Sequence, residues 1–251
     1  MQYERYWRWL PAIARRGLER WTSGLDQRNA VFRRLAKALK GAGVEGDARL
    51  AAYFAWAQEE DLLKLYSSEF RANLGQTCAA QPLLEFLEPL PPSVSPLDRM
   101  LALEQRFFLA DHNLTYTDKM SMAVGVEVRV PFLDVDLVEH AAKIPLGLKQ
   151  RGRVGKWVLK RAMEPYLPRG AIYRPKTGFG APLRRWLRNE LRPLVDDVLS
   201  ADTIRRRGIF DPVAVGRMVQ SDREGHADAA YTIFAIVCIE IWCRSFLSRG
   251  L

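Results

Sequence analysis

The feature that most constrains the fold of this chain is the helical spacing of its apolar residues along almost its whole length. Residues 11–22 show it, because Pro11 suits a first helical turn and Ile13, Leu18 and Trp21 fall roughly along one face. The same spacing predicts helices over residues 28–41, 47–58, 60–73, 97–110, 115–124, 135–143, 154–165, 182–199, 211–220 and 226–248. Only short extended pieces such as residues 126–130 remain for strands, so the sequence predicts a mainly α fold.

A proline-rich stretch interrupts this pattern between Pro82 and Pro96, with Pro89, Pro91 and Pro92 inside it. Proline removes a backbone donor and breaks helices, so we expect a connector here. It is the best internal boundary that the sequence offers. We therefore divide the chain into a helical segment over residues 1–96 and a second segment over residues 97–251.

The chain is basic, with 38 Lys and Arg residues against 29 Asp and Glu residues and a net charge of +9. Such a surface favours anions such as nucleotide, pyrophosphate or nucleic acid. No basic run reaches the length typical of nucleic-acid-binding tails, and the aromatic residues do not interleave with the basic ones. Solvated helix faces therefore explain the charge better than a nucleic-acid surface does. The helix over residues 11–22 fits a packed helix, and a membrane-surface helix is the alternative.

The three cysteines and three histidines show no metal-ligand spacing, so we expect no metal site. An odd number of cysteines fits reduced thiols in a cytosolic protein. The longest apolar stretch, residues 231–239, is far shorter than the roughly 20 residues that a membrane helix needs. Glu4 and Arg5 lie where a signal peptide would place its apolar region. We therefore expect a soluble cytoplasmic protein with no membrane segment.

Residues 118–134 stand apart from the helical pattern. A helix that carries Asp118 should end near Gly125, where a left-handed residue can terminate it. In the extended stretch that follows, Glu127 and Arg129 alternate with valines, so the two charges share one face. We expect the valine face to be buried and the charged face to be presented. From the residues alone, a structural ion pair that links helices is the better interpretation, and a functional site is the alternative.

The segment reads Asp118-Lys119-Met120-Ser121-Met122-Ala123-Val124-Gly125-Val126-Glu127-Val128-Arg129-Val130-Pro131-Phe132-Leu133-Asp134. It resembles the pattern Asp-Arg/Lys-x-Ser-Met-x-x-x-x-Glu-x-Arg-x-Pro-Phe-Leu-Asp of the synthetase domain in the glutamine-hydrolysing asparagine synthetase family. Beta-lactam synthetase relatives carry a looser form. Asp134 is also a good N-cap for the helix predicted over residues 135–143, which Pro145 would end.

A second block supports the resemblance and contains Arg174-Pro175-Lys176-Thr177-Gly178-Phe179. It is similar to the family's Leu-Pro…Arg-x-Lys-x-Gly-Phe…Pro…Trp pattern. A lysine on a glycine-containing loop suits phosphate, because its ammonium is a compact donor and glycine lets backbone amides approach. The resemblance implies that Lys176 meets the ATP phosphates and is catalytic. Without the resemblance, a surface lysine in a flexible loop would be the better interpretation.

The resemblance also implies a fold and an activity. The fold is the helical portion of an adenine-nucleotide alpha-hydrolase-like (PP-loop ATP pyrophosphatase) α/β domain, lacking most of the parallel sheet. The activity is adenylation of aspartate, or a related carboxylate, by MgATP, followed by attack of ammonia from a glutaminase domain. The full-length form is expected to be a homo-oligomer. Supporting roles, in the wall of the site or in ordering the Lys176 loop, fall to Asp118, Lys119, Ser121, Glu127, Arg129 and Gly178.

The family's ATP-binding loop, Ser-Gly-Gly-x-Asp-Ser, has no counterpart in this sequence. Ser23-Gly24-Leu25-Asp26 does not qualify, because Leu25 replaces the second glycine. We therefore expect the chain to start downstream of the nucleotide-binding sheet, as a truncated gene model, a fragment or one piece of a split gene. ATP and Mg²⁺ would then bind mainly through the missing half. A helical interaction module without catalysis is the alternative, and nucleic-acid binding ranks last.

Overall fold

We describe the chain from a computed structural model. It describes residues 10–23, 25, 30–39, 41–55, 57, 59–75, 77–175 and 181–247. The chain divides into two compact units: unit 1 comprises Met1–Gln2 and Glu85–Gly178, and unit 2 comprises Tyr3–Leu84 and Phe179–Leu251. Both are helical in their described parts, where the only sheet is two-stranded, so the predicted mainly α fold is confirmed.

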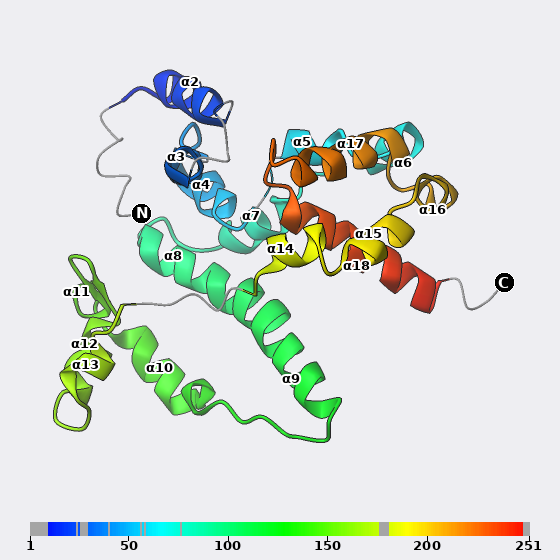
Figure 1. Ribbon diagram of the computed structural model, residues 1–251. Coiled ribbons are helices and arrows are strands. Elements are labelled where there is room, and N and C mark those ends of the chain that lie inside the picture. The colour runs from blue at the N-terminus through cyan, green and yellow to red at the C-terminus, as the bar shows by residue number, and fades with distance from the viewer. Residues whose placement is uncertain are drawn as a thin grey trace. The chain divides into compact units, whose positions relative to one another are not determined.

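Unit 2 draws its helices from two separate stretches of the chain (Figure 1). Its first stretch contains α2 (Ala12–Ser23), α3 (Ala30–Leu39), α4 (Gly46–Ala52), α5 (Glu59–Leu63) and α6 (Ser68–Leu74), and α7 (Gln81–Leu87) lies at the boundary. Its second stretch contains α14 (Leu183–Arg188), α15 (Arg192–Val198), α16 (Ala201–Arg207), α17 (Pro212–Arg223) and α18 (Ala230–Phe246). Helices α14, α15 and α17 all pack against α18, the longest of them.

The core of unit 2 is a cluster of buried aliphatic side chains from α14 to α18. Val215 is fully buried, and Val198, Ile204 and Ile236 are almost so. Leu65 joins this cluster from the first stretch of the chain. Burying such a side chain contributes about 1.5–3 kcal/mol, so this cluster is the main source of stability in unit 2.

Most predicted helices of unit 2 are present, but two of them are split. The helix expected over residues 60–73 is interrupted at Tyr66, which forms an isolated antiparallel bridge with Phe210. The backbone amide of Ser67 donates to Ile209, and the Ser67 hydroxyl caps α6 by accepting from the Phe70 amide. The helix expected over residues 182–199 is broken into α14 and α15 near Asn189. Neither interruption is visible in the apolar spacing.

Unit 1 is built around a continuous helical rod in its first half (Figure 1). The rod joins α8 (Pro96–Leu103), the π-helical η1 (Glu104–Leu114) and α9 (Thr115–Met122). Separate helices were expected over residues 97–110 and 115–124, and this expectation was wrong because the π-helical turns carry the chain through. After the rod come the 3-10 turn η2 (Pro131–Leu133), α10 (Val135–Lys143), α11 (Leu146–Lys149), β1 (Gln150–Arg151), β2 (Val154–Gly155), α12 (Trp157–Met163) and α13 (Arg169–Ile172).

Two further expectations need correction. The stretch from Pro82 to Pro96 is not wholly a connector, because α7 occupies its first part, with Pro82 in the first turn where a missing amide is tolerated. Residues 126–130 are extended but belong to neither described strand. The two strands lie instead in the hairpin of β1 and β2, where Gly152 takes the positive φ of +57° that the tight turn requires.

Candidate functional site

The segment that carries the candidate site begins on α9. Asp118 and Lys119 lie on this helix with exposed side chains, and the Ser121 hydroxyl donates to the backbone carbonyl of Asp118 at 3.0 Å. The helix ends as predicted, because Gly125 has a φ of +71° and its amide donates to the carbonyl of Met122. The chain then leaves the rod at a fixed position.

Glu127 and Arg129 form an ion pair on the extended stretch that follows. Arg129 Nη2 lies 2.8 Å from Glu127 Oε1, so the two charges share one face as the alternation predicts. Both side chains are largely exposed, 65% for Glu127 and 83% for Arg129. Water screens such a pair, so its contribution to stability is small, and its charges are available to a ligand or to another protein segment.

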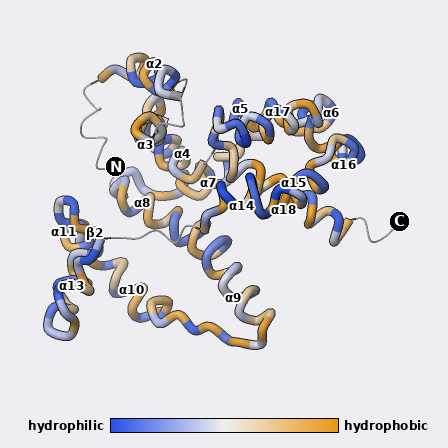
Figure 2. The backbone as a smooth tube through the Cα atoms, viewed as in Figure 1, coloured by the Kyte–Doolittle hydropathy of each residue, from blue (hydrophilic) through white to orange (hydrophobic). Residues whose placement is uncertain are grey.

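The valine face of this stretch is not buried, and this expectation was wrong. Val126, Val128 and Val130 are 53%, 44% and 39% exposed. Figure 2 shows the hydrophobic residues alternating with hydrophilic ones along this part of the chain, between α9 and α10. Periodicity therefore predicted which face is apolar but not that this face is exposed.

The exit of the segment is fixed by a helix cap. After the 3-10 turn η2, the Asp134 carboxylate accepts the Leu137 amide at 3.0 Å and caps α10. This confirms the predicted N-cap and the helix over residues 135–143. The five residues of the extended stretch are thus held at both ends.

Lys176 and Gly178 lie outside the described residues. In the described chain that leads to them, Glu164 accepts hydrogen bonds from the Tyr173 hydroxyl at 2.8 Å and from the Arg161 guanidinium at 2.6 Å. The hydrogen bond from Tyr173 lowers the pKa of the Glu164 carboxyl, and the same bond raises the pKa of the Tyr173 hydroxyl. Lys160 also lies over the Tyr173 ring, 5.2 Å from its centroid.

The described chain from Ala181 onward is held within unit 2 by two bidentate ion pairs. Arg184 donates to both oxygens of Asp228 at 2.7 and 2.8 Å, and Arg188 donates to both oxygens of Asp222 at 2.9 and 3.1 Å. Asp222 is only 1% exposed and also accepts the amide of Ala229. These contacts fix α14, which begins at Leu183.

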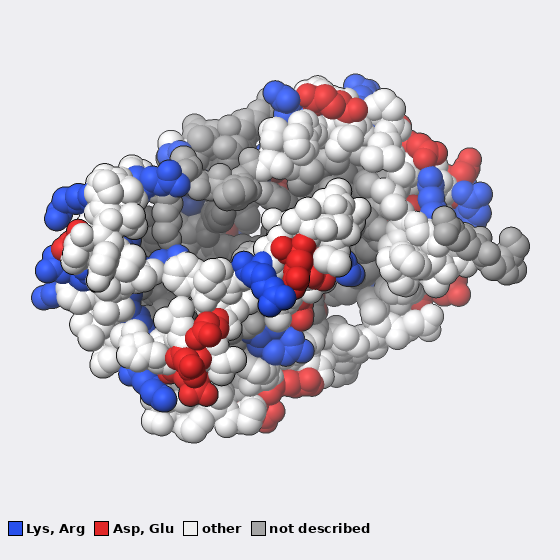
Figure 3. Space-filling model, turned by 90° about the horizontal axis from the view of Figure 1, so that it is seen from below, with Lys and Arg blue, Asp and Glu red and all other residues white. Residues whose placement is uncertain are grey.

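The positive charge of the chain is concentrated in one stretch of unit 1. Ten of the 38 Lys and Arg residues, but only one of the 29 Asp and Glu residues, lie between Lys143 and Lys176. This stretch therefore accounts for the whole net charge of +9. Figure 3 shows Lys and Arg side chains gathered at the left-hand edge, on the side where Figure 1 places α11 to α13. Such a concentration attracts phosphate-bearing ligands.

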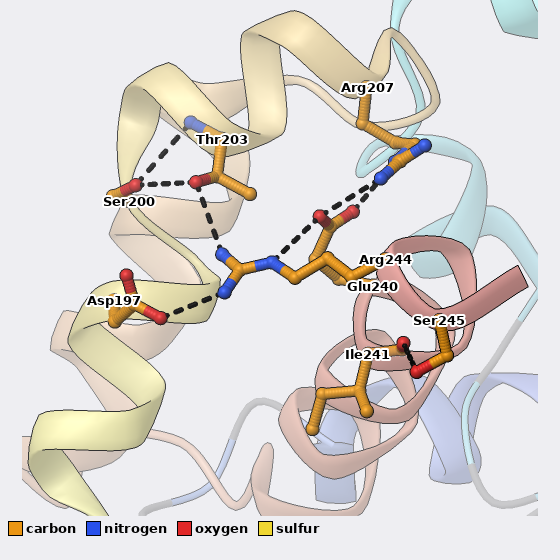
Figure 4. Close-up of polar contacts among 8 residues, drawn as sticks. All are labelled: Asp197, Ser200, Thr203, Arg207, Glu240, Ile241, Arg244 and Ser245. Carbon is orange, nitrogen blue, oxygen red and sulfur yellow. Dashed lines mark hydrogen bonds and ion pairs between the residues drawn. The ribbon is translucent and has the colours of Figure 1, made fainter. Parts of the chain in front are cut away.

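Sequence reasoning missed two features that the structure reveals. Lys156 is the only non-glycine residue with a positive φ (+56°) in the described part of the chain, and such strain is typical of functional positions. The second is a network around Glu240, which accepts Arg207 at 2.8 and 3.2 Å and Arg244 at 3.2 Å (Figure 4). The spacing of Glu240 and Arg244 by four residues was the available signal. No comparable sequence signal points to Arg207, which lies on α16.

The described residues contain neither a membrane-spanning helix nor a metal cluster. No helix among them is long and apolar enough to cross a membrane. Nor do they contain a group of three or more His, Cys, Asp or Glu residues that could hold a metal ion.

Comparison with known proteins identifies relatives. A protein of Mycobacterium tuberculosis, provisionally named as a glutamine-hydrolysing asparagine synthetase, is 32% identical over 156 residues, which are 62% of this chain and 24% of that protein. Asparagine synthetase [glutamine-hydrolyzing] 1 of Bacillus subtilis is 29% identical over 150 residues, 60% of this chain and 23% of its own length. Asparagine synthetase [glutamine-hydrolyzing] 1 of Arabidopsis thaliana is 41% identical over 70 residues, 25% of this chain and 12% of its own length.

The chain thus spans about a quarter of the length of the first two relatives. No solved structure matches it. The family described as asparagine synthase matches residues 1–244, including residues 1–96. The domain of this family has an adenine-nucleotide alpha-hydrolase-like fold, and the helices described above agree with its helical portion. The chain belongs to the asparagine synthase family.

Proposed function

We propose that this chain contributes the carboxy-terminal, Lys176-bearing part of an ATP-dependent asparagine synthase. The observation that carries the proposal is the segment over residues 118–134, whose family pattern is held between a helix end at Gly125 and a helix cap at Asp134. Because the chain spans about a quarter of its relatives, the nucleotide loop and the glutaminase domain would come from other sequence.

In the proposed reaction, a carboxylate oxygen of aspartate attacks the α-phosphorus of ATP, and pyrophosphate leaves. Ammonia then attacks the acyl carbon of the adenylate, the bond to AMP breaks, and a proton is lost from nitrogen. Negative charge grows on the departing pyrophosphate, so a cation held there stabilises the transition state more than the ground state. Lys176 would be that cation.

Three described features support anion chemistry near this part of the chain. The Glu127–Arg129 pair presents its charges to solvent, which suits a wall that meets a polar substrate. Asp118, Lys119 and Ser121 lie at the end of α9, close in sequence to that pair. The basic stretch from Lys143 to Lys176 would draw ATP toward Lys176.

The remaining assignments rest on the family. The acceptor would be aspartate or a related carboxylate, the ammonia would come from glutamine, and Mg²⁺ would accompany ATP, mainly through the rest of the protein. We place the reaction in the cytoplasm, in a homo-oligomer. Comparing aspartate with other carboxylates in adenylate formation would identify the acceptor.

The test replaces Lys176 by alanine in the chromosomal gene and isolates the protein in the form in which its cells make it. Aspartate-dependent exchange of pyrophosphate into ATP should be lost, whereas glutamine hydrolysis should persist, because ammonia release does not need the adenylate. Lys64→Ala is the matched control, since Lys64 is an exposed lysine outside the basic stretch and pairs with Asp61 at 2.7 Å. Exchange that survives Lys176→Ala would contradict the catalytic assignment.

The second candidate is a helical interaction module without catalysis, and one observation favours it. Large apolar side chains of unit 1 such as Met120, Val124 and Phe132 are more than half exposed, as expected of a surface that another polypeptide covers. If the isolated native protein lacks aspartate-dependent exchange while a second polypeptide co-purifies with it, this candidate replaces the enzyme.

A further inference from the structure

An open hollow lies in unit 2 where α5, α6 and the start of α17 meet. Its volume is about 620 Å³, and Figure 1 shows these three helices next to one another. Such a volume falls within the range of about 300–1,000 Å³ that is typical of sites for small molecules. The residues that line it come from two distant stretches of the chain, residues 63–72 and Asp211. It shares no residue with the segment over residues 118–134.

The hollow is built on a fixed junction between these two stretches. Tyr66 forms the antiparallel bridge with Phe210 and stacks on its ring, with the ring centroids 5.4 Å apart. The backbone amide of Asp211 donates to the carbonyl of Leu65 at 2.8 Å. Because backbone hydrogen bonds and ring stacking join the stretches, the lining is formed before any ligand arrives, and a ligand does not have to order it.

Three hydrogen-bond donors line the hollow without a partner in the described part of the chain. They are the hydroxyls of Tyr66 and Ser68, which make no hydrogen bond there, and the guanidinium of Arg71, which forms no ion pair there. Ser68 and Arg71 are three residues apart on α6, so they lie on the same face of that helix. An arginine beside hydroxyl groups binds a carboxylate through charge-assisted hydrogen bonds.

Asp211 adds a negative charge to the same lining. Its Oδ1 atom accepts the Ala214 amide at 2.6 Å, and a carboxylate has room for further donors. Lys64 also lines the hollow, but its ammonium is already paired with Asp61 at 2.7 Å. The lining therefore offers one unpaired cation, Arg71, and one carboxylate, Asp211. This combination suits a ligand that carries both charges better than it suits a simple anion.

We infer that this hollow binds a free α-amino acid with an apolar side chain. The ligand carboxylate accepts hydrogen bonds from Arg71 and the two hydroxyls, and the ligand ammonium donates to the carboxylate of Asp211. Leu63 and Ala72 also line the hollow and suit an aliphatic side chain. A phosphate or a dicarboxylate fits less well, because Asp211 repels a dianion. The proposed reaction gives no role to this part of unit 2, so the two assignments can fail separately.

Isothermal titration calorimetry of the full chain with L-leucine tests the site. We expect a dissociation constant on the order of 0.1–1 mM, as for a small ligand in an open site. Two analogues each lack one charge: 4-methylpentanoate is leucine without its ammonium, and leucinamide has no carboxylate. Each should bind at least about 10-fold more weakly than L-leucine, because each leaves a charged group of the lining unmatched. Inorganic phosphate, succinate and L-glutamate probe the other ligand classes and should also bind more weakly.

Three variants place the ligand in the hollow. Arg71→Gln should weaken binding of L-leucine at least about 10-fold, because the carboxylate loses its cation. Arg205→Gln is the matched control, since Arg205 is an exposed arginine on another helix of unit 2 and does not line the hollow. Asp211→Asn should remove the preference for L-leucine over 4-methylpentanoate, and it keeps the cap of α17 because asparagine caps helices as well as aspartate does. Circular dichroism checks that each variant is folded.

The comparison of ligands on the native chain decides the matter even if a variant misfolds. A native chain that does not bind L-leucine at about 10 mM would overturn the inference. So would equal binding of 4-methylpentanoate, or tighter binding of phosphate, succinate or L-glutamate, because the hollow would then recognise a different class of ligand. Binding that Arg71→Gln leaves unchanged, or that Arg205→Gln weakens equally, would place the ligand elsewhere. None of these results bears on Lys176, which pyrophosphate exchange tests.

Discussion

Units 1 and 2 are both assembled from short amphipathic helices, yet they differ in what their apolar faces touch. In unit 2, the helices from α14 to α18 enclose a continuous core that includes Val215 and Ile236. In the described part of unit 1, only Leu87 and Leu103 are buried hydrophobic residues, while seventeen large hydrophobic side chains are exposed. Apolar spacing thus tells which face is apolar, and the partner elements decide whether that face is covered.

The charged groups show the same difference. Unit 2 buries Asp222 and Glu240, and it matches each carboxylate with an arginine that donates two hydrogen bonds. Unit 1 keeps the Glu127–Arg129 pair in solvent. The ion pairs of unit 2 therefore hold helices together, whereas the exposed pair of unit 1 contributes little to stability.

The largest expected effect comes from placing a charge in each unit. Val215→Asp puts an unpaired carboxylate at a fully buried site of unit 2 and should lower the free energy of unfolding by about 3–5 kcal/mol. Val128→Asp makes the same change in unit 1 at a side chain that is 44% exposed and should cost under about 0.5 kcal/mol. Urea unfolding followed by circular dichroism measures both, and equal costs would contradict the comparison.

The next effect concerns the buried carboxylate. Glu240→Ala should destabilise unit 2 by about 2–4 kcal/mol, because Arg207 and Arg244 both lose the buried carboxylate that they share. Glu127→Ala, which breaks the exposed pair of unit 1, should change stability by at most about 0.5 kcal/mol. Thermal unfolding of both variants tests this, and a larger loss in Glu127→Ala would reverse the ranking.

Stability should also depend on pH through Glu240. Burial alone would raise the pKa of this carboxyl, but the hydrogen bonds from Arg207 and Arg244 outweigh it and hold the pKa below the ordinary value of 4.5. A lowered pKa stabilises the folded state above pH 4.5, and this stabilisation is lost as the pH falls below 4.5 toward the folded value. Unfolding of Glu240→Gln should show a weaker pH dependence in that window. An unchanged dependence would show that Glu240 does not carry it.

The smallest effect compares the same helix cap in both units. Asp211 accepts the Ala214 amide at 2.6 Å at the start of α17, and Asp134 accepts the Leu137 amide at 3.0 Å at the start of α10. Alanine at either position should cost about 1 kcal/mol. Hydrogen exchange should show that Asp211→Ala lowers amide protection throughout unit 2, whereas Asp134→Ala lowers it only within α10. Equal spreading would mean that unit 1 is as cooperative as unit 2.

Much of the fold could be predicted from the sequence, because apolar spacing and capping residues act locally. Asp134 and Gly125 marked a helix start and a helix end that the structure confirms. The breaks at Tyr66 and Asn189 could not be predicted, since the first depends on a bridge to Phe210, far along the chain, and the second lies within an unbroken apolar pattern.

The candidate site was predictable only as a pattern of residues. The alternation of charged residues with valines predicted that Glu127 and Arg129 share one face, and their 2.8 Å contact confirms this. The same alternation predicted that the valines of this stretch are buried. This prediction was wrong, because burial requires a second surface, which the spacing does not specify. The role of Lys176 stays a prediction, since that residue lies outside the described chain.

Hydrogen exchange of the isolated chain tests the contrast between the units most directly. On α18, residues whose side chains face the core of unit 2 should have backbone amides that exchange about 1,000-fold or more slower than in an unfolded peptide. These amides become accessible only when the whole unit opens. Amides of residues 126–130 should exchange at nearly the rate of an unfolded peptide, because the valines and the ion pair around them are exposed. Comparable protection in both regions would contradict the account, since it would require a cover over unit 1 within this chain.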